Sequence, residues 1–392
     1  MQEPGSTSLD PEEKHRIERN ASPEVHRRLM LRAVGLSRRG AGRVEPNPMV
    51  GCVIARGDRL IGEGYHRKFG GPHAELEALA NCTESAQGAT AYVTLEPCRH
   101  HGKTPPCTKA LIEAGIAEVF VAVRDPLKEV SGGGIRELRQ AGIKVHVGSC
   151  AEEAAEVLAP FLVRVRLRRP YVIAKWAQSL DGRLATRTGH SQWISCEESR
   201  RQVHKLRARV DAILVGSGTV LADDPMLTAR DVVLKRRALR VVLDGRLRLR
   251  EKCQLVAPAG RHRTLVFTSP GKSKSPKARR LIAQGVEVVG CRRGSDGLSL
   301  SACLAELHQR EVTNLLVEGG AAVLSSFLRG HLVDEARVFV APIMIGGNGA
   351  SVAFAKDGVE RVDKALAPRK VSVKPSAQDV VYQMHFTDPL KL

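Results

Sequence analysis

The first half of the chain alternates between helical and strand-type spacing of its apolar residues. Residues 24–40 carry apolar side chains at helical spacing among arginines, and Gly40 ends that run. A short apolar run from Met49 to Ala55 follows, and a Gly57-Asp58 turn joins it to a second run toward Gly64. Two short apolar runs joined by such a tight turn predict a β-hairpin.

Further helices and strands are predicted in turn up to residue 147. Apolar runs predict strands at residues 91–95, 118–123 and 144–147, and helical patterns occupy residues 73–80, 109–114 and 135–141. Strands separated by helices of this length are typical of an α/β layered sheet. Candidate ligands are expected in the loops and helix starts at the ends of such strands.

Strand-type runs dominate from residue 170 onward. After a run from Tyr171 to Lys175, further β-type runs occupy residues 212–215, 240–243, 264–267, 286–289, 314–317 and 336–340. Helical patterns at residues 196–209 and 299–310 alternate with them. This alternation predicts a second α/β domain.

One loop of the second half contains adjacent glycines. The stretch Val317-Glu318-Gly319-Gly320 runs from a strand into two glycines, and a helix of small residues follows through Val323. Glycines allow a phosphate to approach the backbone, and the exposed N–H groups of a helix start attract anions. No Gly-x-Gly-x-x-Gly sequence opens a βαβ unit, so a Rossmann fold is not expected.

The length of 392 residues predicts two domains, and the hydrophobic content of 43% is enough for two cores. Residues 1–22 are polar and charged with no apolar segment after them, so we expect a disordered tail and neither a signal peptide nor an anchor. No run approaches the roughly 18 apolar residues that cross a bilayer. The expected domains span residues 23–150 and 170–392, and the arginine-rich end of residues 151–169 predicts a solvated linker.

Composition narrows the choice of compartment and partner. Nine cysteines are scattered without the dense spacing of a disulfide framework, which favours a reducing cytosol. The formal net charge of +19 is compatible with nucleic acid or with anionic small molecules. Aromatic residues make up only 4% of the chain, whereas single-strand binders usually combine a basic groove with stacking platforms. We therefore expect a small-molecule substrate and neither nucleic acid nor a membrane as partner.

Three residues of the kind that bind zinc lie within residues 73–107. His73, Cys98 and Cys107 supply one imidazole and two thiols, and a catalytic zinc site keeps its fourth tetrahedral position for water. Glu75, two residues after His73, is close enough to carry protons without occupying the metal. His-x-Glu followed by Pro-Cys is the signature of zinc deaminases, although eight residues rather than two separate the cysteines here.

Two simpler interpretations of this cluster are weighed beside the catalytic one. A histidine at a helix start is commonly a polar terminus, and a lone cysteine is commonly a small buried apolar residue. A closed structural zinc site would use the same ligands, but it would not require a carboxylate beside an open face. Glu75 therefore favours catalytic chemistry.

Longer motifs surround these ligands. They are Asn47-Pro48-Met49-Val50-Gly51-Cys52-Val53-Ile54, His73-Ala74-Glu75, and Thr94-Leu95-Glu96-Pro97-Cys98 through Gly102-Lys103-Thr104-Pro105-Pro106-Cys107. Over about residues 25–150 they closely resemble the deaminase half of the bifunctional riboflavin-biosynthesis deaminase/reductase family, whose long gap between cysteines matches this chain. The resemblance implies a cytidine-deaminase-like α/β/α domain with zinc on His73, Cys98 and Cys107 and with Glu75 as proton donor.

The first half also departs from that family at a few positions. Glu77 and Leu127 both stand where the family usually has Asn. Ser131-Gly132-Gly133 stands where Ala-Gly-Arg is commoner. These departures concern contacts to the pyrimidine rather than the metal ligands.

The second half carries four further motifs. They are Lys175-Trp176-Ala177-Gln178-Ser179-Leu180-Asp181-Gly182, Ser191-Gln192-Trp193-Ile194, Thr219-Val220-Leu221-Ala222-Asp223-Asp224-Pro225 and Val317-Glu318-Gly319-Gly320. Over about residues 170–385 they resemble the reductase half of the same family, which implies a dihydrofolate-reductase-like α/β fold. The implied NADPH contacts are Ala177, Trp193, Thr219, Asp223, Gly320, Ala321, Ala322, Val323, Leu324, Ser325 and Ser326.

The same resemblance implies a substrate site. Its contacts are Ser191, Arg207, Leu227, Arg230 and Glu318, with Lys175 as a catalytic group near the reacting ribose. Gly245 follows Asp244 where a cofactor-binding Ser is common, so that contact loses its side chain here.

Several of these residues also have a physical rationale of their own. Arg207 and Arg230 carry planar charged forks that suit a phosphate, although each could be an exposed surface arginine. Trp193 could flank a nicotinamide or belong to a core. Asp223 could instead be a turn residue that bonds its own backbone. Because the hydride comes from the cofactor, the chain need only position the reactants and stabilise charge. The candidates for that polar support are Lys175, Asp223 and Glu318.

The sequence thus predicts a two-domain cytosolic enzyme for consecutive steps of riboflavin synthesis. The resemblance implies zinc-dependent deamination of 2,5-diamino-6-(5-phosphoribosylamino)pyrimidin-4(3H)-one, in which Glu75 carries a proton from water to the leaving ammonia. NADPH-dependent reduction of the ribosyl group would then give 5-amino-6-(5-phosphoribitylamino)uracil. The preference for NADPH and a homo-oligomeric state both rest on the resemblance.

Two other classes of protein are the alternatives. A deaminase of a tRNA base would use the same zinc chemistry and would explain the charge. It predicts salt-sensitive RNA binding and leaves residues 170–385 unexplained. A non-catalytic binding protein could retain the fold, and metal analysis would separate it from an enzyme. Intact Glu75 together with all three ligands counts against it.

Overall fold

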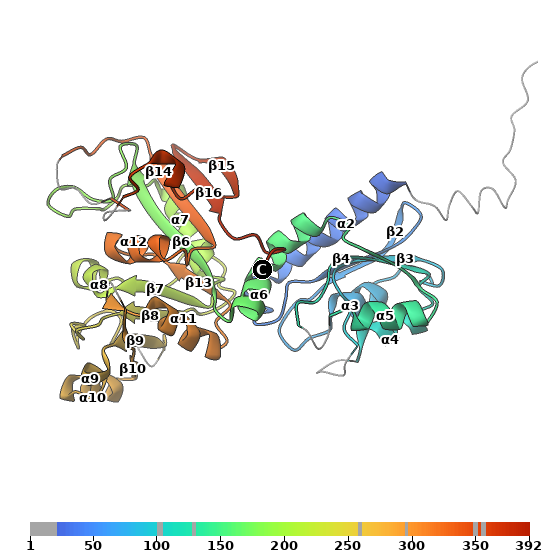
Figure 1. Ribbon diagram of the computed structural model, residues 1–392, viewed down its shortest axis with the longest axis horizontal. Helices are drawn as coiled ribbons and strands as arrows, with labels where there is room; N and C mark the ends of the chain where they lie inside the picture. The colour runs from blue at the N-terminus through green and yellow to red at the C-terminus, as the bar shows by residue number, and fades with distance from the viewer. Residues whose placement is uncertain are drawn as a thin grey trace, which may run out of the picture. The chain divides into compact units, whose positions relative to one another are not determined.

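The computed structural model describes residues 22–99, 105–127, 131–257, 261–294, 297–347, 352–353 and 358–392. The chain divides into two compact units, Met1–Val165 and Arg166–Leu392, and each is described by itself (Figure 1). Residues 1–21 of the expected tail lie outside the described residues. The same holds for Gly102-Lys103-Thr104 in the motif that leads to the second cysteine.

The first unit is built on a mixed sheet that, in the described residues, has five strands in the order β2-β1-β3-β4-β5. The strands are β1 Gly51–Arg56, β2 Arg59–Tyr65, β3 Thr90–Leu95, β4 Glu118–Val123 and β5 Lys144–Val147. β1 pairs antiparallel with β2 and β3, while β3, β4 and β5 run parallel. Arg56 pairs with Arg59, so the Gly57-Asp58 turn closes the predicted hairpin.

Helices cover both faces of this sheet. They are α2 Pro23–Ser37, the 3-10 turn η1 Arg38–Gly40, α3 Ala74–Ala80, α4 Cys107–Glu113, α5 Gly133–Gln140 and α6 Ala151–Leu167. Val53 and Phe120 pack in a core cluster with α2 and α6. Their chain neighbours Ile54 and Val121 pack in a second cluster under α3, α4 and α5. Because alternate strand residues face opposite ways, the unit has α/β/α layers.

The segment expected to be a linker is helical over most of its length. α6 buries Ala154, Leu158, Phe161 and Leu162 in the core cluster that it shares with α2. This spacing forms one apolar face of a helix, which must be covered. The linker prediction is therefore wrong for residues 151–167, because the arginines that suggested it begin at Arg164, directly after a buried apolar stripe that ends at Val163.

The arginine run at the end of α6 is also not uniformly solvated. Arg169 makes two hydrogen bonds with the carboxylate of Asp334, at 2.6 and 2.8 Å. The side chains of Arg169 and Asp334 are 14% and 0% exposed. A paired and largely buried guanidinium anchors the start of the second unit.

The second unit is built on a sheet whose described strands number nine, in the order β10-β9-β8-β7-β13-β6-β14-β16-β15. They are β6 Tyr171–Ser179, β7 Ala212–Gly216, β8 Leu239–Leu243, β9 Thr264–Thr268, β10 Val286–Gly290, β13 Asn314–Val317, β14 Glu335–Ala341, β15 Lys370–Ser376 and β16 Asp379–His385. Neighbouring strands run parallel from β10 to β14, and β16 and β15 continue the sheet antiparallel. The short strands β11 Arg293–Gly294 and β12 Gly297–Leu298 pair separately.

Helices and one short turn complete the second unit. They are α7 Glu197–Arg207, α8 Ser217–Asp223, α9 Pro270–Ser273, α10 Pro276–Ala283, α11 Leu300–Gln309, α12 Ala321–Arg329 and the 3-10 turn η2 Val362–Lys364. Leu304 of α11 and Phe327 of α12 pack with Val241 of β8 in one core cluster. α7, α11 and α12 agree with the sequence prediction, whereas α8, α9 and α10 are absent from it. Across the described ranges, every helix is too short or too polar to span a lipid bilayer.

Candidate active sites

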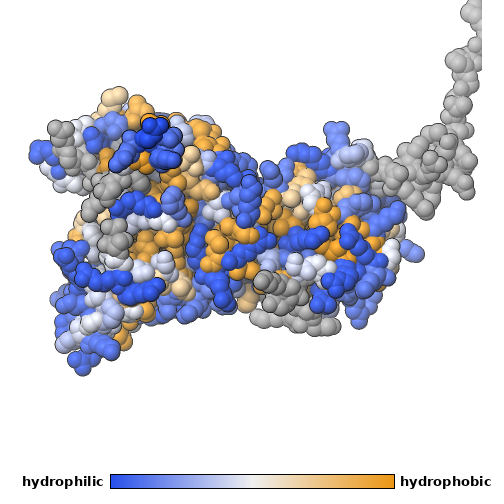
Figure 2. All heavy atoms as spheres, in the orientation of Figure 1, coloured by the Kyte–Doolittle hydropathy of each residue, from blue (hydrophilic) through white to orange (hydrophobic). Residues whose placement is uncertain are grey.

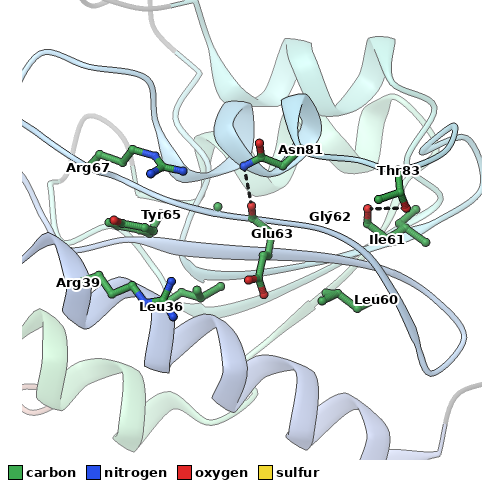
Figure 3. A pocket seen from close by; sticks show the side chains of 11 residues that line it. Leu36, Arg39, Leu60, Ile61, Gly62, Glu63, Tyr65, Arg67, Asn81 and Thr83 are labelled. Carbon is green, nitrogen blue, oxygen red and sulfur yellow. Dashed lines mark hydrogen bonds between the residues drawn. The ribbon is translucent and has the colours of Figure 1, made fainter.

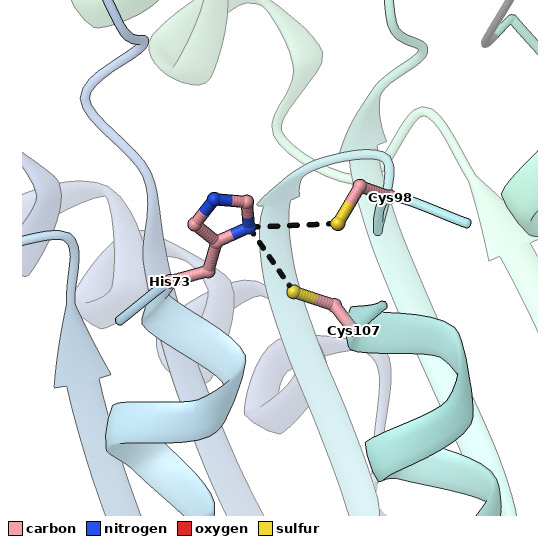
Figure 4. Close-up of side chains that lie close together, drawn as sticks. All are labelled: His73, Cys98 and Cys107. Atoms are coloured by element: carbon pink, nitrogen blue, oxygen red, sulfur yellow. Dashed lines mark hydrogen bonds between the residues drawn. The ribbon is translucent and has the colours of Figure 1, made fainter. Parts of the chain in front are cut away.

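The three predicted zinc ligands converge in the first unit (Figure 4). His73 Nδ1 lies 3.5 Å from Cys98 Sγ and 3.3 Å from Cys107 Sγ. The three ligand atoms all lie within 4.8 Å of one another. Within the described ranges, no other group of histidine, cysteine and acidic residues meets that spacing.

The donor set fits a tetrahedral zinc ion. With Zn–N of about 2.0–2.1 Å and Zn–S of about 2.3 Å, tetrahedral angles place a nitrogen and a sulfur ligand roughly 3.5 Å apart. The two observed N–S separations, 3.5 and 3.3 Å, agree with that edge. One imidazole and two thiols leave one coordination position free, which suits an open site rather than a closed one.

Local structure fixes each ligand at the end of an element. His73 is the N-cap of α3, Cys107 is the first residue of α4, and Cys98 lies in the loop that follows β3. Thr108 donates to the Cys98 carbonyl from its N–H at 3.1 Å and from its hydroxyl at 3.3 Å. These two bonds hold the segments of both cysteines together.

Glu75 is buried beside the ligands, with 3% of its surface exposed. Burial raises the pKa of the Glu75 carboxyl, and the nearby His73 partly offsets that shift. A carboxyl with a raised pKa is closer to neutral pH, where proton transfer in both directions is efficient. The hydrogen bond from Cys107 and the proximity of His73 lower the pKa of the Cys98 thiol to about 4, which favours the thiolate that binds metal.

Glu96, two residues before Cys98, ties the loop after β3 to the loop after β4. Its carboxylate is 3% exposed and accepts hydrogen bonds from the backbone N–H groups of residues 125, 132, 134 and 135, at 3.0–3.3 Å. A Cβ at Gly134 would lie 2.0 Å from the Pro97 carbonyl oxygen, so this close approach needs glycine. Sequence reasoning missed Glu96, because a carboxylate before a proline does not reveal donors from a loop distant in the sequence.

The structure shows the surroundings of three positions at which the chain departs from the family pattern, namely Glu77, Gly133 and Leu127. Glu77 Oε2 accepts a hydrogen bond from Arg67 Nε at 2.7 Å. A Cβ at Gly133 would lie 2.6 Å from Arg99 Nε, so the Arg99 side chain fills the space beside that position. Leu127 is 39% exposed. A longer side chain at position 133 would therefore displace Arg99.

In the second unit, Lys175, Arg207 and Glu318 form one partly buried charged cluster. Val317 of β13 pairs with Ala174 of β6, which brings Glu318, just after the end of β13, beside Lys175 in the middle of β6. Arg207, the last residue of α7, donates from Nε to Glu318 Oε1 at 2.6 Å and from Nη2 to Oε2. The fork of Arg207 is thus bonded to Glu318.

Burial and pairing shift the pKa values in this cluster. Burial lowers the pKa of Lys175, and the charge of Glu318 offsets part of that shift. Burial alone would raise the pKa of Glu318, but Arg207 outweighs it, so the pKa of Glu318 is lowered. His204 is a member of this neighbourhood that sequence reasoning missed. Burial and the charges of Arg207 and Arg230 lower its pKa.

The glycine loop before α12 approaches α8 closely. Gly320 has a φ of 66°, and a Cβ there would lie 3.0 Å from Thr219 Oγ1. Two residues implied as cofactor contacts, Thr219 and Gly320, therefore lie together. Ala322, Val323 and Ser326 of α12 line a cavity of about 950 Å³. A cavity of this size is large enough for a dinucleotide.

The other predicted reductase residues lie on segments around β6 and α8. Ala177 lies on β6, Ser191 and Trp193 follow it, Asp223 ends α8, and Leu227 and Arg230 come next. Trp193 is 67% exposed, and the Arg200 guanidinium lies 4.7 Å from its ring centroid, so the core interpretation of Trp193 is wrong. Arg230 is exposed, and within the described ranges its guanidinium pairs with no carboxylate.

Another hollow, of about 350 Å³, lies beside α2 and β2 (Figure 3). Leu36 of α2 and Leu60 and Tyr65 of β2 contribute to its lining. Asn81 donates a hydrogen bond to the Glu63 carbonyl at 3.0 Å. None of its lining residues belongs to the predicted metal, substrate or cofactor sets.

The positive charge is dispersed over both units. Figure 2 shows hydrophilic side chains interspersed with apolar ones on the visible face of each unit. Many arginines pair with carboxylates, as Arg56 and Arg59 do with Glu84 at 3.0 and 2.8 Å. Exposed pairs of this kind contribute little to stability. A dispersed charge does not by itself indicate a nucleic-acid surface.

Two family models match successive parts of the chain. The zinc-binding region of cytidine and deoxycytidylate deaminases matches residues 23–123, and the RibD C-terminal domain matches residues 170–382. The riboflavin biosynthesis protein RibD of Aquifex aeolicus is 42% identical over 362 residues, which are 91% of this chain and 98% of the relative. The protein of the same name from Escherichia coli K12 is 40% identical over 334 residues, 81% of this chain and 88% of the relative.

Solved structures resemble the chain over nearly its whole length. RibD of Acinetobacter baumannii matches with a TM-score of 0.80 and 37% identity, covering 94% of this chain and 100% of that one. A diaminohydroxyphosphoribosylaminopyrimidine deaminase/5-amino-6-(5-phosphoribosylamino)uracil reductase from Thermotoga maritima matches with a TM-score of 0.79 and 36% identity, covering 93% and 99%. Both units thus have counterparts within one relative.

Proposed function

Because the chain belongs to the RibD family of bifunctional riboflavin-biosynthesis enzymes, we propose a division of labour among its residues, with deamination in the first unit and reduction in the second. The family joins a zinc-dependent, cytidine-deaminase-like domain to an NADPH-dependent reductase domain of dihydrofolate-reductase-like fold. Its substrate is a phosphoribosylated diaminopyrimidine, which is deaminated to the uracil and then reduced in its ribosyl group.

In the first unit, His73, Cys98 and Cys107 are proposed to hold the zinc ion. The observation that carries this proposal is the convergence of their three donor atoms within 4.8 Å. When bound, zinc supplies a Lewis acid that makes water acidic enough to react near neutral pH. Glu75 accepts a proton from the attacking water at its carboxylate and delivers it to the leaving amine. Its burial and raised pKa support that role.

In the second unit, Lys175 and Glu318 are proposed to face the ribosyl group during reduction. When bound, NADPH supplies the hydride, so these residues position the sugar and stabilise charge that develops on it. Arg207 acts through Glu318, because its two bonds fix the orientation of that carboxylate. Arg230, whose guanidinium is exposed, is the proposed partner of the substrate phosphate.

The test supplies the diaminopyrimidine phosphate with and without NADPH and resolves the products by mass. Wild-type protein should release ammonia without NADPH and form the ribityl product only with it. His73→Ala should lose zinc and ammonia release, because two thiols alone do not complete the site. Lys175→Ala should keep ammonia release and lose oxidation of NADPH.

The two variants serve as each other's control. The uracil intermediate, supplied directly to His73→Ala, should still be reduced, which shows that the chain is folded. If His73→Ala still released ammonia, the assignment of His73, Cys98 and Cys107 as zinc ligands would be wrong. NADPH oxidation at the wild-type rate in Lys175→Ala would remove Lys175 from the reduction.

We further propose that the enzyme works in a reducing cytosol and as a homo-oligomer. All nine cysteines are free, and two of them must stay reduced to bind metal. The oligomeric state rests on the family resemblance alone. Light scattering of the purified zinc-loaded chain measures it, and a monomer mass would contradict it.

A further inference from the structure

The cavity that begins at α12 extends along the carboxyl ends of β8 and β9 to a basic end. Its lining includes Arg246 and Arg248 after β8, Lys272 of α9 and Arg293 of β11. Asp244 is the one carboxylate among the described lining residues, and its Oδ2 already accepts a hydrogen bond from a backbone N–H at 2.7 Å. Four cationic side chains thus share one cavity with a single carboxylate.

Three of these cations pair with no carboxylate among the described residues. In the described part of the chain, Arg246, Lys272 and Arg293 pair with no carboxylate, whereas nearby Arg280 pairs with Glu251 at 3.0 Å. Like charges gathered in a hollow repel one another, and the low-dielectric walls strengthen their field. An anion that enters the cavity removes that repulsion, so the arrangement favours a ligand with several negative charges.

Arg248 differs from the other three because its side chain is held. Its Nη2 donates a hydrogen bond to Ser217 Oγ at 3.0 Å, and Ser217 is the first residue of α8. This bond keeps Arg248 on the side of the cavity toward α8, where Thr219 approaches the glycine loop. Arg246, Lys272 and Arg293, by contrast, lie after β8, on α9 and on β11.

We propose that Arg246, Lys272 and Arg293 bind the 2′-phosphate of NADPH and thereby set the preference for NADPH over NADH. This inference rests on the proposed reductase function. The two cofactors differ by one phosphate monoester, which carries about −1.5 to −2 charges at pH 7. A dinucleotide that extends from the contacts on α12 brings its adenosine end to these cations. Guanidinium forks bind phosphate oxygens in pairs, and a lysine adds a point charge.

The test measures direct binding rather than turnover. The full zinc-loaded chain is titrated with NADPH and with NADH, following cofactor fluorescence, for wild type and for Arg246→Ala, Lys272→Ala and Arg293→Ala. Each substitution should weaken NADPH binding about tenfold, because one charge-assisted hydrogen bond is lost, and should change NADH binding by less than about twofold. Lys274→Ala is the matched control, since Lys274 is exposed two residues further on and does not line the cavity.

Two nucleotide fragments sharpen the result. Adenosine 2′,5′-bisphosphate should compete with NADPH in wild type and lose that advantage over adenosine 5′-monophosphate in the three variants. Equal weakening of NADPH and NADH would overturn the inference, because the cations would then bind the shared pyrophosphate. Unchanged NADPH binding in all three variants would also overturn it. Wild-type protein that binds no dinucleotide would instead overturn the reductase assignment itself.

Discussion

The two candidate sites differ in how far apart in the sequence their residues lie. The proposed deaminase site takes its three ligands and its proton carrier from residues 73–107, and the ligand atoms of His73, Cys98 and Cys107 lie within 4.8 Å of one another. The proposed reductase site takes its residues from β6, α7, α8, the end of β13 and α12, which span residues 171–329. One proposed site is a short stretch of chain whose donor atoms fit a metal ion, and the other is spread over central strands of a sheet and the helices beside them.

This difference follows from what performs the chemistry in each case. A metal ion needs a few donors at fixed distances, and short loops at the ends of β3 and at the starts of α3 and α4 can supply them. A dinucleotide brings its own reactive group, so the chain must supply a long cavity and distributed charge. We therefore expect an all-or-none response to substitutions in the first site and a graded response in the second.

The largest expected effect is that of Glu75→Gln on deamination. Ammonia release should fall by about 10²–10⁴-fold, because the carboxylate that carries the proton is lost while the zinc ligands remain. Zinc content, measured by metal analysis, should stay at the wild-type level. Glu113→Gln, which alters an exposed carboxylate at the end of α4, is the control. Loss of zinc together with activity would make Glu75 part of the metal cage and break the comparison.

The next effect tests whether the reductase site depends on a buried ion pair. Glu318→Gln leaves Arg207 partly unpaired at a buried position, so the free energy of unfolding of the second unit should fall by about 3–5 kcal/mol. Both tryptophans, Trp176 and Trp193, lie in this unit, so their fluorescence during urea unfolding reports on it alone. An unchanged midpoint would mean that the pair contributes little.

The same variant has a pH signature. The folded-state pKa of Glu318 is lowered from 4.5, so its contribution is fully present above about pH 4.5 and is lost as the pH falls through the lower folded value. Wild-type stability should therefore decline on acidification more steeply than that of Glu318→Gln. Parallel acid limbs in the two proteins would contradict the pairing of Glu318 with Arg207.

A smaller effect is expected at Glu96, which supports a ligand without touching the metal. In Glu96→Gln one of the two acceptor oxygens becomes an NH₂ group facing backbone donors, which should loosen the loop that carries Cys98. Zinc affinity, measured by chelator competition, should fall about 10–100-fold. Excess zinc should restore deamination, and reductase activity should be unchanged. Failure of rescue at saturating zinc would show a role beyond positioning.

The smallest expected effect is a gain in NADPH affinity on substitution of Gly245, in the proposed reductase site. A Cβ there would lie 3.6 Å from the Leu298 side chain, which is ordinary contact, so serine fits without rearrangement. Its hydroxyl can donate to the cofactor, and NADPH should bind about two- to tenfold more tightly to Gly245→Ser. Gly245→Ala supplies the side-chain volume without the hydroxyl. A gain of the same size in Gly245→Ala would assign the effect to packing.

The sequence predicts much of the fold because its central strands are locally apolar. β4 and β13 begin and end where the apolar runs do, since buried strands need continuous hydrophobic residues. β15 and β16 escape prediction because residues such as Val371 and Val373 alternate with polar ones at an exposed sheet edge. α6 escapes prediction because glutamates precede and interrupt its buried positions and arginines follow them, so the charged ends conceal the apolar stripe.

The same contrast holds for the sites. His73, Cys98 and Cys107 can be predicted because three strong donors with a nearby carboxylate are a rare local combination. The Arg207–Glu318 pair joins residues far apart in the sequence, so local pattern offers no signal that they bond to each other. Both are predicted as substrate contacts only through family resemblance. Glu96 and the basic end of the large cavity depend on backbone and cation positions that only the folded chain supplies.

The burial of α6 decides where the gene can be divided. A fragment that stops at residue 150 would lack Leu158 and Leu162. Phe120 and the apolar face of α2 would then be exposed to solvent, so the fragment should aggregate when expressed. A fragment that continues through Leu167 contains all of α6 and keeps that apolar surface buried. A fragment designed to study the deaminase reaction alone should therefore include the whole of α6 with its arginines.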